Sequence, residues 1–105
     1  MLTSKQRAYL RSLAMNEDTI VIIGKGGITE NVITQVRDAL KARELVKGKV
    51  LENSLLSSRE ACEALAEACK AQSVQSIGSK FVLYRMQHDK NKRKIELVRD
   101  RKKSV

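Results

Sequence analysis

The sequence is poor in the residues that build metal sites, disulfides and aromatic platforms. Its 105 residues include two cysteines, one histidine, no tryptophan, two tyrosines and one phenylalanine. Cys62 and Cys69 lie in a helical pattern, and a separation of seven residues places them about 10.5 Å apart along a helix axis. A disulfide needs Cα atoms within roughly 7 Å, so we expect two buried thiols that do not bridge each other. With His88 distant in sequence, no zinc ligand set exists, and no metal or cofactor is expected.

Long apolar runs are also missing. None exceeds four residues, as in Ile20–Ile23, so we expect no transmembrane helix, no signal-peptide core and no membrane partner. The 42% apolar and 31% charged residues are typical of a folded globular chain. Folding at this length buries roughly two-thirds of the unfolded surface, which is enough for one core. These features predict a single-domain cytoplasmic protein.

Positive charge is what the chain has in excess. Lys and Arg number 21 against 12 Asp and Glu, which gives a net charge of +9 and a pI near 9.9. Such an excess favours a polyanionic partner, because phosphate neutralisation supplies much of nucleic-acid affinity; a merely basic surface is the alternative. Residues 58–72 carry two basic and three acidic side chains, whereas residues 86–105 carry eight basic and three acidic ones. We therefore expect the segment 58–72 to face away from a bound anion.

Helical and strand periodicities alternate along the chain. The predicted helices cover about 4–15, 30–43 and 58–72, and the predicted strands cover 19–23, 45–51, 74–77 and 81–85. This order predicts an α/β (α+β) fold of two layers, α-β-α-β-α-β-β, in which a mixed four-stranded sheet packs on the helices. Residues 95–98 are predicted to add a short strand or extension, and residues 99–105 a flexible basic tail.

Capping signals mark the three predicted helix starts. Thr3–Gln6 and Ser57–Glu60 have the pattern of a capping box, in which side chain and backbone groups bond reciprocally. Thr29 can cap the second helix, where Glu30 favours the positive end of the helix dipole.

Two strands carry further expectations. The strand 19–23 is apolar on both faces, which predicts a central position in the sheet. In the strand 45–51, alternation places Lys47 and Lys49 on one face and Val46, Gly48 and Val50 on the other. The two lysines fit a solvated surface and a binding surface equally well.

The most distinctive stretch is Gly24-Lys25-Gly26-Gly27, between the first strand and the second helix. Open backbone N–H groups beside a lysine suit a phosphate. A Walker loop is excluded by the glycine spacing and the missing hydroxyl, and a dinucleotide fingerprint by Thr29 at the sixth position. No Ser/His/Asp or Cys/His set suggests nucleophilic catalysis, so we expect no enzyme and no small-molecule substrate.

These four residues also satisfy Gly-x-x-Gly, the loop that clamps the nucleic-acid backbone in KH modules. A simple strand-to-helix turn needs glycine as well, so the motif alone does not decide. The scarcity of aromatic residues disfavours an RRM, whose sheet stacks bases on aromatic side chains. Binding should therefore depend on backbone and shape.

Several stretches, taken in order, resemble the CRM (YhbY-type) RNA-binding domain family over nearly the whole chain. They are Leu2–Arg7 with Leu10–Ala14, Ile23–Glu30, Glu44–Lys47, Val74–Gly78 and Val82–Arg85.

The resemblance implies a fold similar to the C-terminal domain of bacterial translation initiation factor 3, and RNA binding through the Gly-x-x-Gly loop. Stand-alone bacterial members are associated with precursors of the large ribosomal subunit, and plant relatives of repeated domains assist group II intron splicing. Gly48 departs from the family pattern, in which an apolar strand residue is usual at this point.

From these observations we expect a monomeric, non-catalytic RNA-binding domain over residues 1–98 that acts in large-subunit assembly. Alternatives are a ribosomal structural or interaction protein that binds RNA through its basic tail, an intron-RNA splicing cofactor and a DNA-binding module. The predicted site is the loop, with Lys25 on a phosphate and the N–H groups before Thr29 donating, flanked by basic side chains. Its residues are Gly24, Lys25, Gly26, Gly27, Thr29, Lys5, Arg7, Arg11, Lys80 and Arg85.

Overall fold

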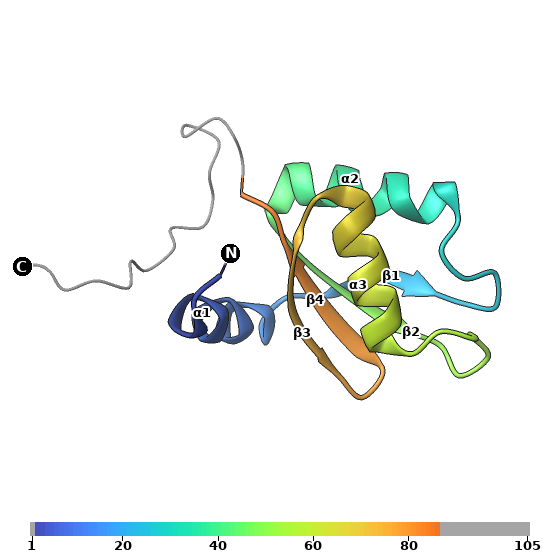
Figure 1. The fold of residues 1–105 in the computed structure, drawn as a ribbon, viewed down its shortest axis with the longest axis horizontal. Coiled ribbons are helices and arrows are strands. Elements are labelled where there is room, and N and C mark those ends of the chain that lie inside the picture. Colours follow the sequence, from blue (N-terminus) through green and yellow to red (C-terminus); the bar gives the residue numbers. More distant parts are fainter. Residues whose placement is uncertain (1, 87–105) are drawn as a thin grey trace, which may run out of the picture.

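Three helices and four strands follow one another in the computed structural model, which describes residues 2–86 (Figure 1). They are α1 (Ser4–Ala14), β1 (Thr19–Ile23), α2 (Glu30–Arg43), β2 (Leu45–Val50), α3 (Ser58–Cys69), β3 (Gln72–Ile77) and β4 (Lys80–Tyr84). This order confirms the predicted α-β-α-β-α-β-β arrangement and the α+β class.

The strands form one mixed sheet in the order β1-β2-β4-β3, with β1 and β2 parallel and the other neighbours antiparallel. The mixed four-stranded sheet is therefore confirmed, but the central position predicted for β1 is wrong. The crossover through α2 places β2 beside β1, and β4 occupies the other side of β2. Val21 and Ile23 are buried in this edge strand, whereas Ile22 is 52% exposed because it lies on the face of the sheet opposite α2 and α3.

Helices lie on both faces of the sheet. Besides the two predicted layers, α1 therefore forms a partial third layer. Helices α2 and α3 cover one face, and α1 packs on part of the other (Figure 1). The larger core lies under α2 and α3 and includes Val21, Ile23, Val36, Leu40, Val46, Leu65, Phe81 and Leu83. The smaller core lies under α1 and consists of Leu10, Ala14, Leu45, Val74, Val82 and Tyr84.

Both predicted capping boxes are present. The N–H of Gln6 donates to Thr3 Oγ1 and the N–H of Thr3 donates to Gln6 Oε1, each at 3.1 Å. At α3, the N–H of Glu60 donates to Ser57 Oγ at 3.1 Å, and the N–H of Ser57 donates to Glu60 Oε1 at 2.9 Å. Helix α3 ends at Cys69, three residues before its predicted end, because Lys70 adopts a left-handed conformation with φ 55°.

Packing against Phe81 explains why Gly48 stands where the family usually has an apolar strand residue. Strand β2 continues through Gly48, which pairs with Phe81 of β4. A β-carbon on Gly48 would lie 2.4 Å from Cζ of the Phe81 ring, so the ring occupies the space of a side chain. Val46 and Val50 face the same core, and Lys47 lies on the other side of the sheet, as the alternation predicts.

Cys62 and Cys69 are free thiols, each 2% exposed. Burial raises the pKa of Cys62 to about 11, and it also raises the pKa of Cys69. At pH 8 the thiolate of Cys62 is then about one part in a thousand of the total. We expect a thiol-reactive dye to label neither cysteine of the native protein within minutes, and to label both in denaturant. Rapid labelling of the folded protein would contradict this packing.

The extension predicted for residues 95–98 and the basic tail predicted for residues 99–105 lie outside the described residues. Within residues 2–86, no helix has the length and apolar character that crossing a membrane requires.

Candidate functional site

The glycine loop forms a turn whose outer backbone is open. The N–H of Gly27 donates to the carbonyl of Gly24 at 3.1 Å, and Gly27 has a φ of +71° that favours glycine. A β-carbon on Gly26 or Gly27 would meet no heavy atom of residues 2–86 within 4 Å. On Gly24 it would touch the side chain of Leu51 at 3.7 Å. Another molecule can therefore approach the backbone closely at Gly26 and Gly27.

Hydrogen-bond donors and positive charge converge at this turn. The N–H groups of Lys25 and Gly26 have no acceptor among residues 2–86, and the exposed Lys25 ammonium has no ion-pair partner among them. Thr29 caps α2, because its hydroxyl accepts from the N–H of Val32 at 3.3 Å. The hydroxyl of Thr29 is therefore engaged in capping α2. Its role at the site is to fix the N-terminus of this helix. Free N–H groups, a helix N-terminus and a lysine together favour an anion.

One end of the sheet brings the loop together with the β3–β4 hairpin. The N–H of Leu51 donates to the carbonyl of Ile23 at 2.8 Å, and the N–H of Val50 donates to the carbonyl of Ser79 at 2.7 Å. Lys80 begins β4 at this end. Arg85 lies at the opposite end, where its N–H donates to the carbonyl of Glu44 at 2.8 Å. Of the two cations predicted from the hairpin, only Lys80 lies at the end of the sheet that carries the loop.

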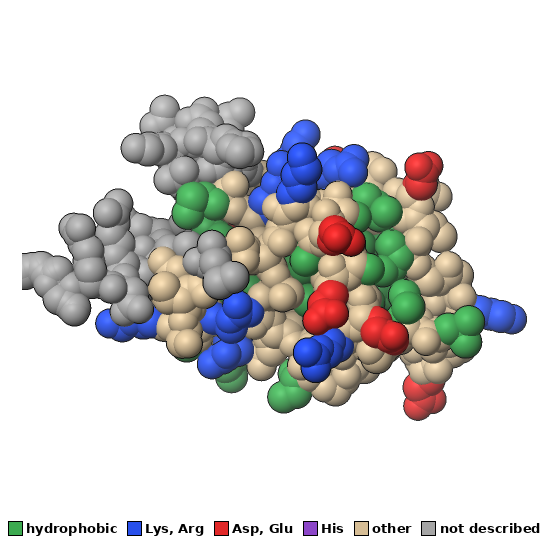
Figure 2. Space-filling view, viewed as in Figure 1, with side chains coloured by type: hydrophobic (Ala, Val, Ile, Leu, Met, Phe, Trp, Pro, Cys, Tyr) green, Lys and Arg blue, Asp and Glu red, His purple; other side chains and the backbone are tan. Residues whose placement is uncertain are grey.

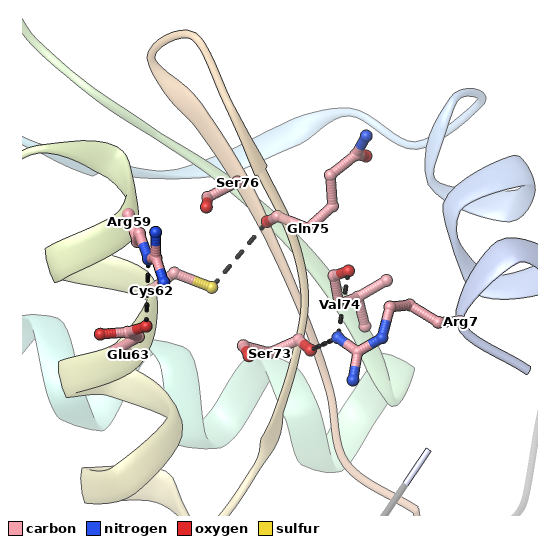
Figure 3. Close-up of a pocket in the computed structure, with 8 residues that line it drawn as sticks. All are labelled: Arg7, Arg59, Cys62, Glu63, Ser73, Val74, Gln75 and Ser76. Carbon is pink, nitrogen blue, oxygen red and sulfur yellow. Dashed lines mark hydrogen bonds and ion pairs between the residues drawn. The ribbon is translucent and has the colours of Figure 1, made fainter. Parts of the chain in front are cut away.

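The cations of α1 are separated from the loop. Figure 1 shows α1 and the β1–α2 connection at opposite sides of the molecule. Arg7 is used within the fold, because its guanidinium Nη1 donates to the carbonyls of Ser73 and Val74 on the edge strand β3 (Figure 3). Lys5 is exposed in the first turn of α1, and Arg11 is exposed near the helix end. The flanking cations expected from the sequence are therefore spread over the surface, although Arg11 and Lys80 both line one concave surface beside the β3–β4 hairpin.

A row of four side chains crosses the sheet on the face that α1 partly covers. Ile22, Lys49, Lys80 and Ile77 are successive cross-strand partners in β1, β2, β4 and β3. Cross-strand partners share one face of a sheet, so Lys49 and Lys80 are neighbours there. Lys49 is not among the predicted site residues, although the alternation of side chains in its strand predicts that it shares a face with Lys47. The missing information was the strand order and register that place it beside Lys80.

The opposite face of the molecule carries negative charge. Glu60, Glu63 and Glu67 are exposed on α3, and Figure 2 shows acidic side chains gathered over this helix. Arg59 pairs with Glu63, with 3.4 Å between Nε and Oε2, which removes one cation from this surface. This negative charge makes the α3 surface unfavourable for a polyanion, and the prediction that residues 58–72 face away from one stays a prediction.

A small cavity of about 220 Å³ lies between α3 and the edge strand β3 (Figure 3). Its cations are occupied: Arg7 bonds the carbonyls of β3, and Arg59 pairs with Glu63. The thiol of Cys62 points at the carbonyl of Gln75, 3.9 Å from Sγ, and its raised pKa keeps it protonated. No group of three or more His, Cys, Asp or Glu residues that could hold a metal occurs in the described part of the chain. Among the described residues, the cavity therefore offers neither an activated thiol nor a group of metal ligands.

Comparison with known proteins matches residues 2–85 to the CRS1/YhbY (CRM) domain. The chain is 43% identical over 97 residues to the probable RNA-binding protein YqeI of Bacillus subtilis, covering 92% of this chain and 99% of that one. It is 36% identical over 84 residues to an RNA-binding protein of Haemophilus influenzae, covering 80% and 85% of the two chains. The solution structure of the hypothetical protein SAV1595 from Staphylococcus aureus superimposes with a TM-score of 0.77 at 50% identity, covering 93% of this chain and all of that one.

Proposed function

Since the chain belongs to the CRS1/YhbY (CRM) domain family, we propose that it is a non-catalytic RNA-binding protein that grips the RNA backbone through Gly24–Gly27. The open turn carries this proposal, because the backbone at Gly26 admits close approach and Lys25 supplies a positive charge that has no ion-pair partner among residues 2–86. Two of its relatives are named as RNA-binding proteins, which supports RNA as the polyanion. Lys80 and Lys49 extend the positive surface along the sheet from the loop.

We further propose that the RNA is ribosomal and belongs to precursors of the large subunit, which places the protein in the cytoplasm. The relative YqeI, of which this chain matches 99%, is also of single-domain size. The resemblance associates stand-alone members with these precursors. We expect the protein to act as a monomer, with residues 1–98 as its domain and residues 99–105 as a tail.

Lys25→Ala tests the loop. Removing one phosphate contact should weaken binding to every RNA and lower the slope of log Kobs against log salt by about one unit. Fluorescence anisotropy titrations between low and physiological salt measure both quantities. Arg37→Gln is the control, because Arg37 is exposed on α2, ten residues after Gly27. An unchanged slope for Lys25→Ala would remove this lysine from the interface.

Deleting residues 99–105 distinguishes the loop from the basic tail. If the loop grips RNA, the truncated protein should retain most of its affinity and its sensitivity to Lys25→Ala. Loss of binding on truncation, with no effect of loop substitutions, would instead indicate a protein that binds RNA through its tail. Preference for duplex DNA over structured RNA at physiological salt would indicate a DNA-binding module.

Sedimentation of cell extracts on a density gradient tests the ribosomal assignment. We expect the protein to travel with large-subunit precursors and to leave them when Lys25 is replaced by alanine. Absence from those fractions, together with recovery of intron RNA on the purified protein, would favour a splicing cofactor.

A further inference from the structure

A second concave surface lies on the α1 side of the sheet, between the C-terminal end of α1 and the β3–β4 hairpin. This groove has a volume of about 310 Å³ and includes Met15, Ile77, Arg11, Lys47 and Lys80 in its lining. Met15 and Ile77 are 80% and 66% exposed, although both are large apolar side chains. They are exposed because α1 ends at Ala14 and leaves the sheet face bare toward the hairpin. The groove thus combines an open concave shape with apolar walls.

The groove is positively charged at its rim. Arg11 and Lys80 are exposed, and neither has an ion-pair partner among residues 2–86. Lys49 adds a charge beside Lys80. Lys47 is held inside, where its Nζ donates to the carbonyl of Ala14 at 3.3 Å. No acidic side chain of the described part of the chain belongs to its lining. Its occupant should therefore present an apolar surface and carry negative charge.

A nucleotide has both properties, because a base has two apolar faces and its phosphates are anionic. We propose that the groove holds one unpaired nucleotide of the RNA bound at the glycine loop. Its base lies against Met15 and Ile77, and its phosphates lie between Lys80 and Arg11. This inference rests on the proposed function, since it assigns a second contact to the same RNA.

The geometry of the sheet links the two contacts. Ile22 lies two residues before Gly24 in β1, and Ile77 lies at the groove. Three interstrand spacings separate Ile22 from Ile77, or roughly 14 Å across the sheet. Lys49 and Lys80 occupy the two strands between them, so positive charge is continuous along this route. One RNA strand can therefore cross from the loop to the groove over cationic side chains.

The chain itself is a poor occupant of this groove. Residues 87–105 carry eight basic and three acidic side chains, so their net charge repels the cations at the rim. The same positive rim favours an RNA over an uncharged apolar segment of a protein partner.

The test compares two RNAs with equal numbers of phosphates, one fully paired hairpin and one hairpin with an unpaired single-stranded stretch. Anisotropy titrations at one physiological salt concentration give the ratio of the two affinities. The wild-type protein should favour the unpaired RNA by about fivefold, which corresponds to roughly 1 kcal/mol, or about 40 Å² of apolar surface buried by one base. Met15→Ser combined with Ile77→Ser should abolish this preference and leave the affinity for the paired hairpin unchanged. Leu55→Ser is the matched control, because Leu55 is 94% exposed in the β2–α3 connection and does not line the groove.

The outcomes separate the groove from the loop. A wild-type protein without preference, or a double variant that keeps it, would overturn the groove proposal while Lys25→Ala still weakened both RNAs. Failure of the proposed function has a different signature, in which Lys25→Ala leaves the affinity for both RNAs unchanged. Met15 and Ile77 are mostly exposed, so we expect the double variant to unfold at a temperature close to that of the wild type. Measuring this midpoint checks that the variant is folded.

Discussion

Gly26→Asp should lower RNA affinity more than a hundredfold while leaving the protein folded. A β-carbon at Gly26 enters open space, and the backbone there does not have the positive φ that would strain a side chain. The carboxylate would, however, stand where the proposed contact places a phosphate. Juxtaposing like charges in an interface costs several kcal/mol, and about 3 kcal/mol corresponds to roughly a hundredfold in affinity. Anisotropy titration with a structured RNA at physiological salt measures the loss.

Two further substitutions at Gly26 divide this effect into size and charge. Gly26→Asn has nearly the shape of aspartate without its charge, and Gly26→Ala adds only a β-carbon. We expect a graded loss, smallest for alanine, intermediate for asparagine and largest for aspartate. Gly27 is unsuitable for this series, because its φ of +71° would make any side chain strain the turn. A folded Gly26→Asp variant that binds RNA like the wild type would falsify the loop proposal.

The features that the sequence predicts well are those decided within a few residues. The capping boxes at Thr3 and Ser57 depend on side chains that reach only three positions along the chain, and both are present. The cap at Thr29 is equally local. Hydrophobic periodicity likewise needs only one helix face or one strand. Element order and class therefore follow from sequence.

Features that depend on neighbours distant in sequence are predicted less well. The apolar strand β1 resembles a buried central strand, yet nothing within it shows that its second neighbour is missing. Arg7 has the appearance of a free surface cation, and its use on the carbonyls of Ser73 and Val74 depends on α1 packing beside the edge strand. The same limit hides Lys49, whose position beside Lys80 follows from the β2–β4 register. The loop is predictable because its residues are consecutive in the sequence. The groove is not, because its lining comes from α1 and three strands of the assembled sheet.

Gly48→Val should destabilise the protein by about 3 kcal/mol, at the upper end of what overpacking a core costs. The β-carbon of any residue at this position would lie 2.4 Å from Cζ of Phe81 and 2.8 Å from Cε1. Phe81 is fully buried, so its ring cannot rotate into solvent to make room. Urea unfolding followed by circular dichroism gives the free energy of unfolding. Gly26→Ala is the matched control, because the same added β-carbon meets no atom within 4 Å there.

A second substitution identifies the ring as the cause of this loss. Phe81→Leu alone should destabilise the protein, because it removes part of a buried ring from the larger core. In the Gly48→Val/Phe81→Leu double variant, the smaller leucine leaves space for the valine. The loss of unfolding free energy in the double variant should therefore be smaller than the sum of the losses in the two single variants. A coupling of 1 kcal/mol or more, about the scale found for residues in direct contact, would show that the glycine accommodates the ring. Additive losses would mean that Gly48 is required for a reason other than Phe81, such as the backbone conformation of β2.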